Sequence, residues 1–232
     1  MLEARIIKSR RDFTVDVDLR IEQGGCLALF GASGSGKSTI LSCIAGIEQP
    51  DEGHVVFGGE RFYPPPMPLH ARNVGYLTQD PHLFPHLTVE RNISFGLGSG
   101  IKVDERAWIE HLRDSLGLSD IWTASAFGIS GGQARRVSVA RMLARRPPLV
   151  LLDEPFTGLD RQLVRELIGD LLAWKREIGF SMIVVDHESE ILERLCSRVA
   201  VVSKGRVIQQ ATWSEVRAQP ADSELQALLR PL

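Results

Sequence analysis

The sequence lacks any long hydrophobic run. No apolar stretch among its 232 residues approaches the roughly 20 residues that a membrane-spanning helix needs. Residues 1–5 also lack the basic flank and the following apolar region of a secretory signal. We therefore expect no spanning helix, and any work at a membrane would require another chain to bring this one there.

Cysteine and net charge are also scarce. The three cysteines, Cys26, Cys43 and Cys196, lie in apolar or helical surroundings without C-x-x-C spacing. We expect all three to be reduced core residues of a cytosolic protein, and we expect none of them to ligate a metal. A formal net charge of −2 gives no basic footprint of a nucleic-acid-binding domain, so nucleic acid is not an expected partner. The length leaves open one large core or two small ones.

The sequence does contain a complete phosphate-loop pattern, G-x-x-x-x-G-K-[ST], at residues 31–38. It follows an apolar run at 26–30 and precedes apolar residues at helical spacing, which predicts a buried strand, a loop and a helix N-terminus. Glycines let backbone N–H groups converge on phosphate oxygens. The residues expected at the phosphates are Gly31, Ala32, Ser33, Gly34, Ser35, Gly36, Lys37, Ser38 and Thr39.

The rest of the chain alternates between strand and helix patterns. Residues 2–21 predict a hairpin that turns near 10–12, and later apolar runs separated by helices predict a mostly parallel sheet covered on both faces. Helical spacing at 108–116 indicates a helical insertion. The fold class is therefore α/β, with an antiparallel N-terminal part. A further helix carries arginines that we interpret as a solvated face, with an anion site as the alternative: Arg135, Arg136, Arg141, Arg145 and Arg146.

Four further elements accompany the phosphate loop. Ser130 precedes two glycines at a helix start, which makes a second cradle for an anion. Asp153 and Glu154 end a buried strand, at the sheet edge where open α/β proteins bind ligands. Asp153 is expected in a Mg²⁺ shell and Glu154 beside a water. Gln79 and His187 each follow a strand.

With these motifs the sequence resembles the nucleotide-binding subunits of ATP-binding cassette (ABC) transporters over nearly its whole length. The matching motifs are Walker A at 31–38, the Q-loop glutamine Gln79, the signature at 130–133, Walker B at 149–154, the D-loop at 158–160 and the switch histidine His187. The segment 83–89 resembles importers, among them molybdate, phosphate and iron uptake ATPases. The resemblance implies a P-loop NTPase fold in one ABC ATPase domain, 1–232, with a helical subdomain at about 82–146 and no C-terminal regulatory domain.

The resemblance also implies an ATPase that works as a homodimer with ATP and Mg²⁺. It would lie at the cytoplasmic face of the membrane, bound to permease subunits that act with a solute-binding protein. ATP would lie between Walker A of one subunit and the signature of the other. The implied trans residues are Ser130, Gly131, Gly132 and Gln133, and Asp160 would link the two sites. The motifs name no solute.

Individual roles follow from the same resemblance. Lys37 would reach the β- and γ-phosphates, and Glu154 would orient or deprotonate the attacking water. His187 would contact the γ-phosphate. The implied Mg²⁺ ligands are Ser38, Gln79 and Asp153, with Gln79 also joining the site to the permease.

The sequence departs from the family at several points. The signature begins with Ile129 in place of Leu, residues 157–158 are Thr-Gly in place of Ser-Ala, and Asp186 replaces the usual Thr before His187. The adenine-stacking aromatic should fall near Arg10; the neighbouring Phe13 is interpreted as core, with stacking as the alternative. Other functions within the family are a soluble ABC ATPase, as in DNA repair or on ribosomes, and an efflux-type ATPase. A single cassette without a long coiled coil argues against the soluble types.

Overall fold

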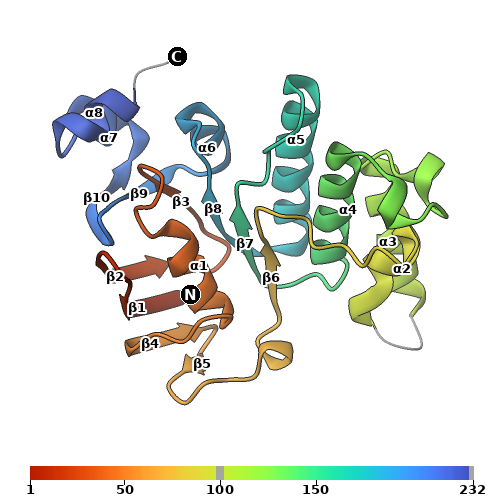
Figure 1. Ribbon diagram of the computed structural model, residues 1–232, viewed down its shortest axis with the longest axis horizontal. Coiled ribbons are helices and arrows are strands. Elements are labelled where there is room, and N and C mark those ends of the chain that lie inside the picture. The colour runs from red at the N-terminus through yellow and green to blue at the C-terminus, as the bar shows by residue number, and fades with distance from the viewer. Residues whose placement is uncertain (98–101, 230–232) are drawn as a thin grey trace.

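The computed structural model describes residues 1–97 and 102–229. In these ranges the strands form one ten-stranded sheet, with helices packed on it (Figure 1). The strands are β1 (Leu2–Ser9), β2 (Thr14–Ile21), β3 (Cys26–Phe30), β4 (Glu52–Phe57), β5 (Glu60–Tyr63), β6 (Val74–Leu77), β7 (Leu149–Asp153), β8 (Ser181–Val185), β9 (Arg198–Ser203) and β10 (Arg206–Thr212). The helices are α1 (Lys37–Ala45), α2 (Val89–Ser94), α3 (Val103–Ser115), α4 (Gly131–Leu143), α5 (Arg161–Ile178), α6 (Ser189–Leu195), α7 (Trp213–Ala218) and α8 (Ser223–Leu228).

The sheet has a parallel centre and an antiparallel flank. Its order is β5-β4-β1-β2-β10-β9-β3-β8-β7-β6. Strands β9, β3, β8, β7 and β6 pair in parallel, whereas β1 pairs antiparallel with both β2 and β4. The predicted α/β fold, with a mostly parallel sheet and an antiparallel N-terminal part, is confirmed. The predicted hairpin is confirmed as well, because Ser9 pairs with Thr14 across its turn.

Alternate residues of β3 face two separate cores. Leu27 and Leu29 join a cluster that contains the apolar side of α1, including Ile40. Ala28 and Phe30 join a second cluster on the other face, which contains the apolar residues of α5 and α6. Strands buried on both faces read as continuous apolar runs because neither face meets water. This two-sided burial holds the end of β3, and thus the phosphate loop, in a fixed place.

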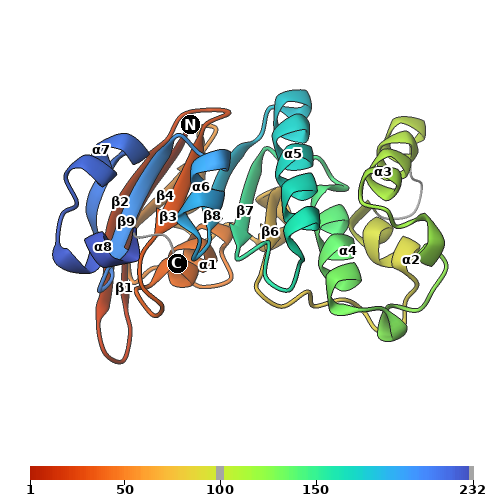
Figure 2. The ribbon, with the colours of Figure 1, turned by 90° about the horizontal axis from the view of Figure 1, so that it is seen from above.

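Helices α2, α3 and α4 gather at one end of the molecule, beyond the edge strand β6 (Figures 1 and 2). Trp108 of α3 is buried and donates its Nε1 hydrogen to the carbonyl of Leu143 at 2.9 Å, which fastens α3 to the end of α4. The predicted helix before Gly117 is confirmed. The limits of the helical subdomain, about 82–146, and the single-domain assignment stay predictions.

The cysteine prediction is wrong for one pair. Cys26, at the start of β3, and Cys196, just after α6, form a disulfide with their Cα atoms 5.0 Å apart. Cys43 is free and buried. The two paired residues are separated by 170 positions in sequence, and only the packing of α6 on β3 brings them together. Within 1–97 and 102–229, no helix is both long enough and apolar enough to cross a membrane.

Candidate active site

The phosphate loop lies between β3 and α1, as predicted. Gly31 has a φ of 150°, and a Cβ there would collide with the carbonyl oxygen of Val202 on β9. Gly36 precedes the first turn of α1 with a φ of 105°, in the left-handed region that favours glycine. The remaining loop residues Ala32, Ser33, Gly34 and Ser35 run between these two points, with Ser33 and Gly34 exposed at the tip.

Lys37 is the first residue of α1, and its side chain folds back into the loop. Its Nζ donates hydrogen bonds to the carbonyl oxygens of Gly31 and Ala32, both at 2.8 Å. Only 6% of the residue is exposed. Burial lowers the pKa of the Lys37 ammonium, while the carboxylates of Asp153 and Glu154 act in the opposite direction. A buried ammonium held at the mouth of a glycine-rich loop is suited to bind phosphate.

Asp153 ends β7 beside the loop and is 5% exposed. Burial raises the pKa of its carboxyl group, and a hydrogen bond from Ser38 lowers it. Among the described residues, no cluster of three histidine, cysteine or carboxylate side chains could hold a metal ion. The oxygen atoms of Ser38 and Asp153 nevertheless fit Mg²⁺, which takes few protein ligands and completes its shell with water and substrate phosphates.

Three predicted residues meet directly after three neighbouring parallel strands. Nε2 of His187, after β8, lies 2.5 Å from Oε1 of Glu154, after β7. Nε2 of Gln79, after β6, donates to Oε2 of Glu154 at 3.1 Å. The hydroxyl of Thr157 donates to the same oxygen at 3.4 Å. Contacts with neighbouring side chains therefore hold both carboxylate oxygens of Glu154 in place. A general base needs a carboxylate positioned in this way.

The signature residues form a separate structure. The Ser130 hydroxyl accepts from the N–H of Gln133 at 3.3 Å, and the Gln133 side chain accepts from the N–H of Ser130 at 2.8 Å, which closes a capping box at the start of α4. Gly131 and Gly132 lie in its first turn. In the part of the chain that the structure describes, no hydrogen bond joins residues 130–133 to the phosphate loop. Asp160 caps α5 by accepting from Gln162 and Leu163. The trans and linking roles stay predictions.

The solvated-face interpretation of the α4 arginines is wrong for Arg135. This side chain is 2% exposed and donates to backbone carbonyls on both sides of the Glu154 cluster. Arg145 and Arg146 are exposed, as expected. The sequence offered one signal for this burial, because the apolar Val139 follows Arg135 by four positions and so lies on the same side of the helix.

Arg10 and Phe13 lie beside the phosphate loop. The Nη2 of Arg10 donates to Oγ1 of Thr39 at 2.8 Å and pairs with Glu48 at 2.7 Å. Phe13 is half-buried, and a Cβ at Gly36 would lie 3.2 Å from its Cε2. Its ring therefore packs on the loop as well as on the core formed with Val15.

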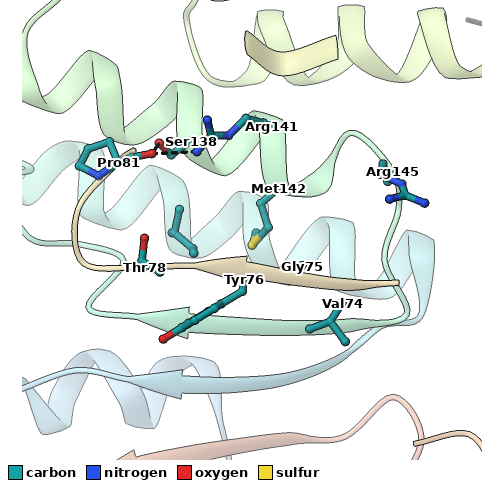
Figure 3. A pocket seen from close by; sticks show the side chains of 10 residues that line it. Val74, Gly75, Tyr76, Thr78, Pro81, Ser138, Arg141, Met142 and Arg145 are labelled. Carbon is teal, nitrogen blue, oxygen red and sulfur yellow. Dashed lines mark hydrogen bonds between the residues drawn. The ribbon is translucent and has the colours of Figure 1, made fainter. Parts of the chain in front are cut away.

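A cavity of about 220 Å³ lies between β6 and α4, beside the start of the segment that contains Gln79 (Figure 3). Ser138 and Arg141 of α4 donate to the carbonyl of Pro81 at 2.9 and 2.8 Å, which fixes this segment to the helix. Thr78 and Arg145 also line the cavity. The cavity is distinct from the phosphate loop and flanks the glutamine segment.

The chain is similar to several known proteins. The model of the ABC transporter family matches residues 14–157. A sulfate/thiosulfate import ATP-binding protein of Agrobacterium fabrum is 42% identical over 219 residues, covering 90% of this chain and 62% of the relative. An Fe(3+) ions import ATP-binding protein of Haemophilus influenzae is 35% identical over 228 residues, covering 93% of this chain and 63% of the relative. The chain thus spans less than two thirds of these two relatives.

Other relatives match over most of their length. A thiamine import ATP-binding protein of Jannaschia sp. is 38% identical over 226 residues, covering 96% of this chain and 97% of the relative. The structure of a dimeric ATP-binding cassette in a post-hydrolysis state, bound to ADP and Pi, superposes with a TM-score of 0.81 at 25% identity, covering 91% of this chain and 98% of that one. The sequence motifs, the fold and these matches agree, and the chain belongs to the ABC transporter family.

Proposed function

We propose that this chain binds and hydrolyses ATP and thereby energises solute import through a membrane permease. The observation that carries the proposal is the cluster in which Gln79 and His187 direct the carboxylate of Glu154, beside a phosphate loop that holds Lys37. Hydrolysis of a phosphate anhydride is promoted by a residue that positions the attacking water near the bound phosphates, and a held carboxylate can do so. The names of the import ATP-binding relatives support the transport part of the proposal.

In this proposal Glu154 orients the attacking water or accepts its proton. His187 and Gln79 limit the rotation of that carboxylate, and His187 also reaches the γ-phosphate. Lys37 exchanges its contacts with loop carbonyls for the β- and γ-phosphates. Ser38, Asp153 and Gln79 would hold Mg²⁺, which would supply positive charge to offset the negative charge that develops in the reaction.

The active unit is proposed to be a head-to-tail homodimer. Ser130, Gly131, Gly132 and Gln133 of one subunit would bind the ATP held by the phosphate loop of the other. Asp160 would connect the two sites. The separation of the signature from the phosphate loop within one chain supports this arrangement, as does the dimeric state of the solved cassette.

The permease is proposed to dock along residues 79–89 and so to hold the chain at the cytoplasmic face of the membrane, in a system with a solute-binding protein. Two features support a docking role: the cavity beside this segment, and the aromatic pair of half-buried Phe84 and exposed Phe95, with ring centroids 4.3 Å apart. Movement of the segment would reach Glu154 through Gln79, which donates to its carboxylate.

The loss of the Lys37 ammonium should weaken ATP binding itself. Lys37→Ala removes a charge that faces the phosphates before and during the reaction, so affinity and rate should both fall. A charge-assisted hydrogen bond of about 1.5–3 kcal/mol corresponds to about a 10- to 150-fold loss of affinity. Calorimetry with Mg-ATP measures this loss of affinity. Lys8→Ala is the control, because it removes a half-buried lysine that pairs with Asp51, away from the loop. Unchanged affinity in Lys37→Ala would place this lysine outside the nucleotide site.

The docking proposal predicts that a substitution in residues 79–89 can uncouple ATP hydrolysis from solute uptake without lowering ATP hydrolysis itself. His86→Glu places a negative charge at an exposed position of the segment, and should lower permease-dependent uptake at least about fivefold, since like-charge or desolvation penalties at an interface reach this size. Basal ATP hydrolysis should not change. His70→Glu, at an exposed histidine outside the segment, is the matched control. Membrane association that survives deletion of every candidate permease would contradict the proposal.

A further inference from the structure

The guanidinium of Arg135 is buried under the Glu154 cluster and donates to five backbone carbonyls. Three belong to the end of β7 and the turn that follows it: Asp153 at 3.1 Å, Pro155 at 2.9 Å, and Glu154. The other two, Thr78 at 2.5 Å and Gln79 at 3.1 Å, follow β6. One side chain thus joins the backbones of the two segments that carry Glu154 and Gln79.

The backbone of Glu154 is held at both of its peptide groups. Its N–H donates to the carbonyl of Val185 at 2.9 Å, and its carbonyl accepts from Arg135. Its φ is 49°, in the left-handed region that a residue other than glycine rarely adopts. Such a conformation persists only where the surroundings hold it. The Glu154 carbonyl also accepts from the N–H of Thr157 at 3.4 Å. These hydrogen bonds, including the one from Arg135, hold the backbone that directs the Glu154 side chain toward His187 and Gln79.

Arg135 also belongs to the helix that begins at the signature. Ser130 caps α4, and Arg135 is the fifth residue of the same helix. A helix is stiff over this length, because consecutive backbone hydrogen bonds connect its turns. Through α4 and the Arg135 guanidinium, the position of Ser130 is therefore mechanically connected to the positions of Glu154 and Gln79.

We propose that Arg135 is a positioning residue for ATP hydrolysis, which fixes Glu154 and Gln79 against the helix that begins at Ser130. The inference rests on the roles proposed above for these three residues. Arg135 should therefore affect the rate of the chemical step. It should have little effect on ATP binding, because none of its hydrogen bonds goes to the phosphate loop.

The chemistry of the side chain matches this task. Arginine has five N–H donors spread over a rigid planar guanidinium, whereas the donors of lysine all lie on one nitrogen atom. Burial lowers the pKa of the Arg135 guanidinium, and the nearby carboxylates of Asp153, Glu154, Asp186 and Asp80 act in the opposite direction. The acidic groups of the site thus offset part of the cost of burying this positive charge.

The experiment compares Arg135→Gln with Arg136→Gln in the full chain. Arg136 is the next residue of α4, is half-buried, and donates to the carbonyls of Leu116 and Gly117, away from the cluster. Both variants lose one arginine that anchors α4 to carbonyls. We expect Arg135→Gln to lower kcat about 10- to 100-fold, as displacements near 1 Å do at a catalytic group, with Mg-ATP affinity within about threefold of wild type. Arg136→Gln should retain kcat within about twofold of wild type, because its contacts do not reach Glu154.

Arg135→Lys keeps the positive charge but lacks the planar guanidinium. It replaces Arg135→Gln in the experiment if circular dichroism shows that Arg135→Gln does not fold. It should remain at least about fivefold below wild type in kcat. A kcat for a folded Arg135 variant within twofold of Arg136→Gln would overturn the inference, and so would an affinity loss as large as the kcat loss. If Glu154→Gln itself hydrolysed ATP at the wild-type rate, the proposed site would fail instead, so the two failures are distinguishable.

Discussion

Glu154→Gln is expected to bind ATP with nearly wild-type affinity and to hydrolyse it at least about 100 times more slowly, the usual effect of removing a general base. The amide has the size of the carboxylate but cannot accept a proton or hold a water as strongly. The phosphate loop and the Lys37 ammonium are unchanged by the substitution. ATP that is bound and not hydrolysed should therefore accumulate in a stabilised dimer.

Gel filtration with Mg-ATP and a steady-state hydrolysis assay measure the two halves of this expectation. Glu166→Gln is the matched control. Glu166 is an exposed glutamate of α5, and within residues 1–97 and 102–229 its carboxylate accepts only from Gln162, at 2.9 Å. The control should behave as wild type in both measurements. A Glu154→Gln protein that stays monomeric with Mg-ATP and turns over at the wild-type rate would remove Glu154 from its proposed role.

The elements around the phosphate loop could be predicted because their signals are local. The apolar run of β3, the glycines of the loop and the helical spacing of α1 lie within residues 26–45, and each is a property of neighbouring residues. The strands β7, β8 and β9 were predictable for the same reason. The short strand β5 and the helices α7 and α8 were not predicted, because their patterns cover only four to six residues.

The approach of Gln79, Glu154 and His187 could be predicted only in part. Each residue follows a strand, and the carboxyl ends of parallel strands share one edge of the sheet. The order of β6, β7 and β8 in the sheet decides which side chains touch, and that order depends on pairing between distant segments. Sequence patterns therefore indicated the edge, and the fold determines the contacts with Glu154.

Two misjudged features have one physical cause. The disulfide of Cys26 and Cys196 joins residues far apart in the chain. The burial of Arg135 depends on carbonyls at the end of β7 and in the segment that follows β6. Charge patterning treats an arginine on a helix as solvated, which is correct only when no distant backbone covers it. Long-range packing reverses that expectation for Arg135 while its neighbours at 145 and 146 remain exposed.

The central claim is that one ATP is held by the phosphate loop of one chain and the signature of another. Lys37→Ala damages the first half-site, and Ser130→Arg damages the second by placing a large cation at the start of α4. Each variant alone forms homodimers in which every site has one defective half. A mixture forms heterodimers with one doubly damaged site and one site in which both halves are intact.

The most direct measurement is ATP occlusion by this mixture, with Glu154→Gln present in both chains to prevent turnover. The heterodimer fraction should occlude ATP at up to about half the stoichiometry of the Glu154→Gln control, since one of its two sites is complete. Each variant alone should occlude almost none. Occlusion by confirmed heterodimers no greater than that of the separate variants would contradict a site shared between two chains.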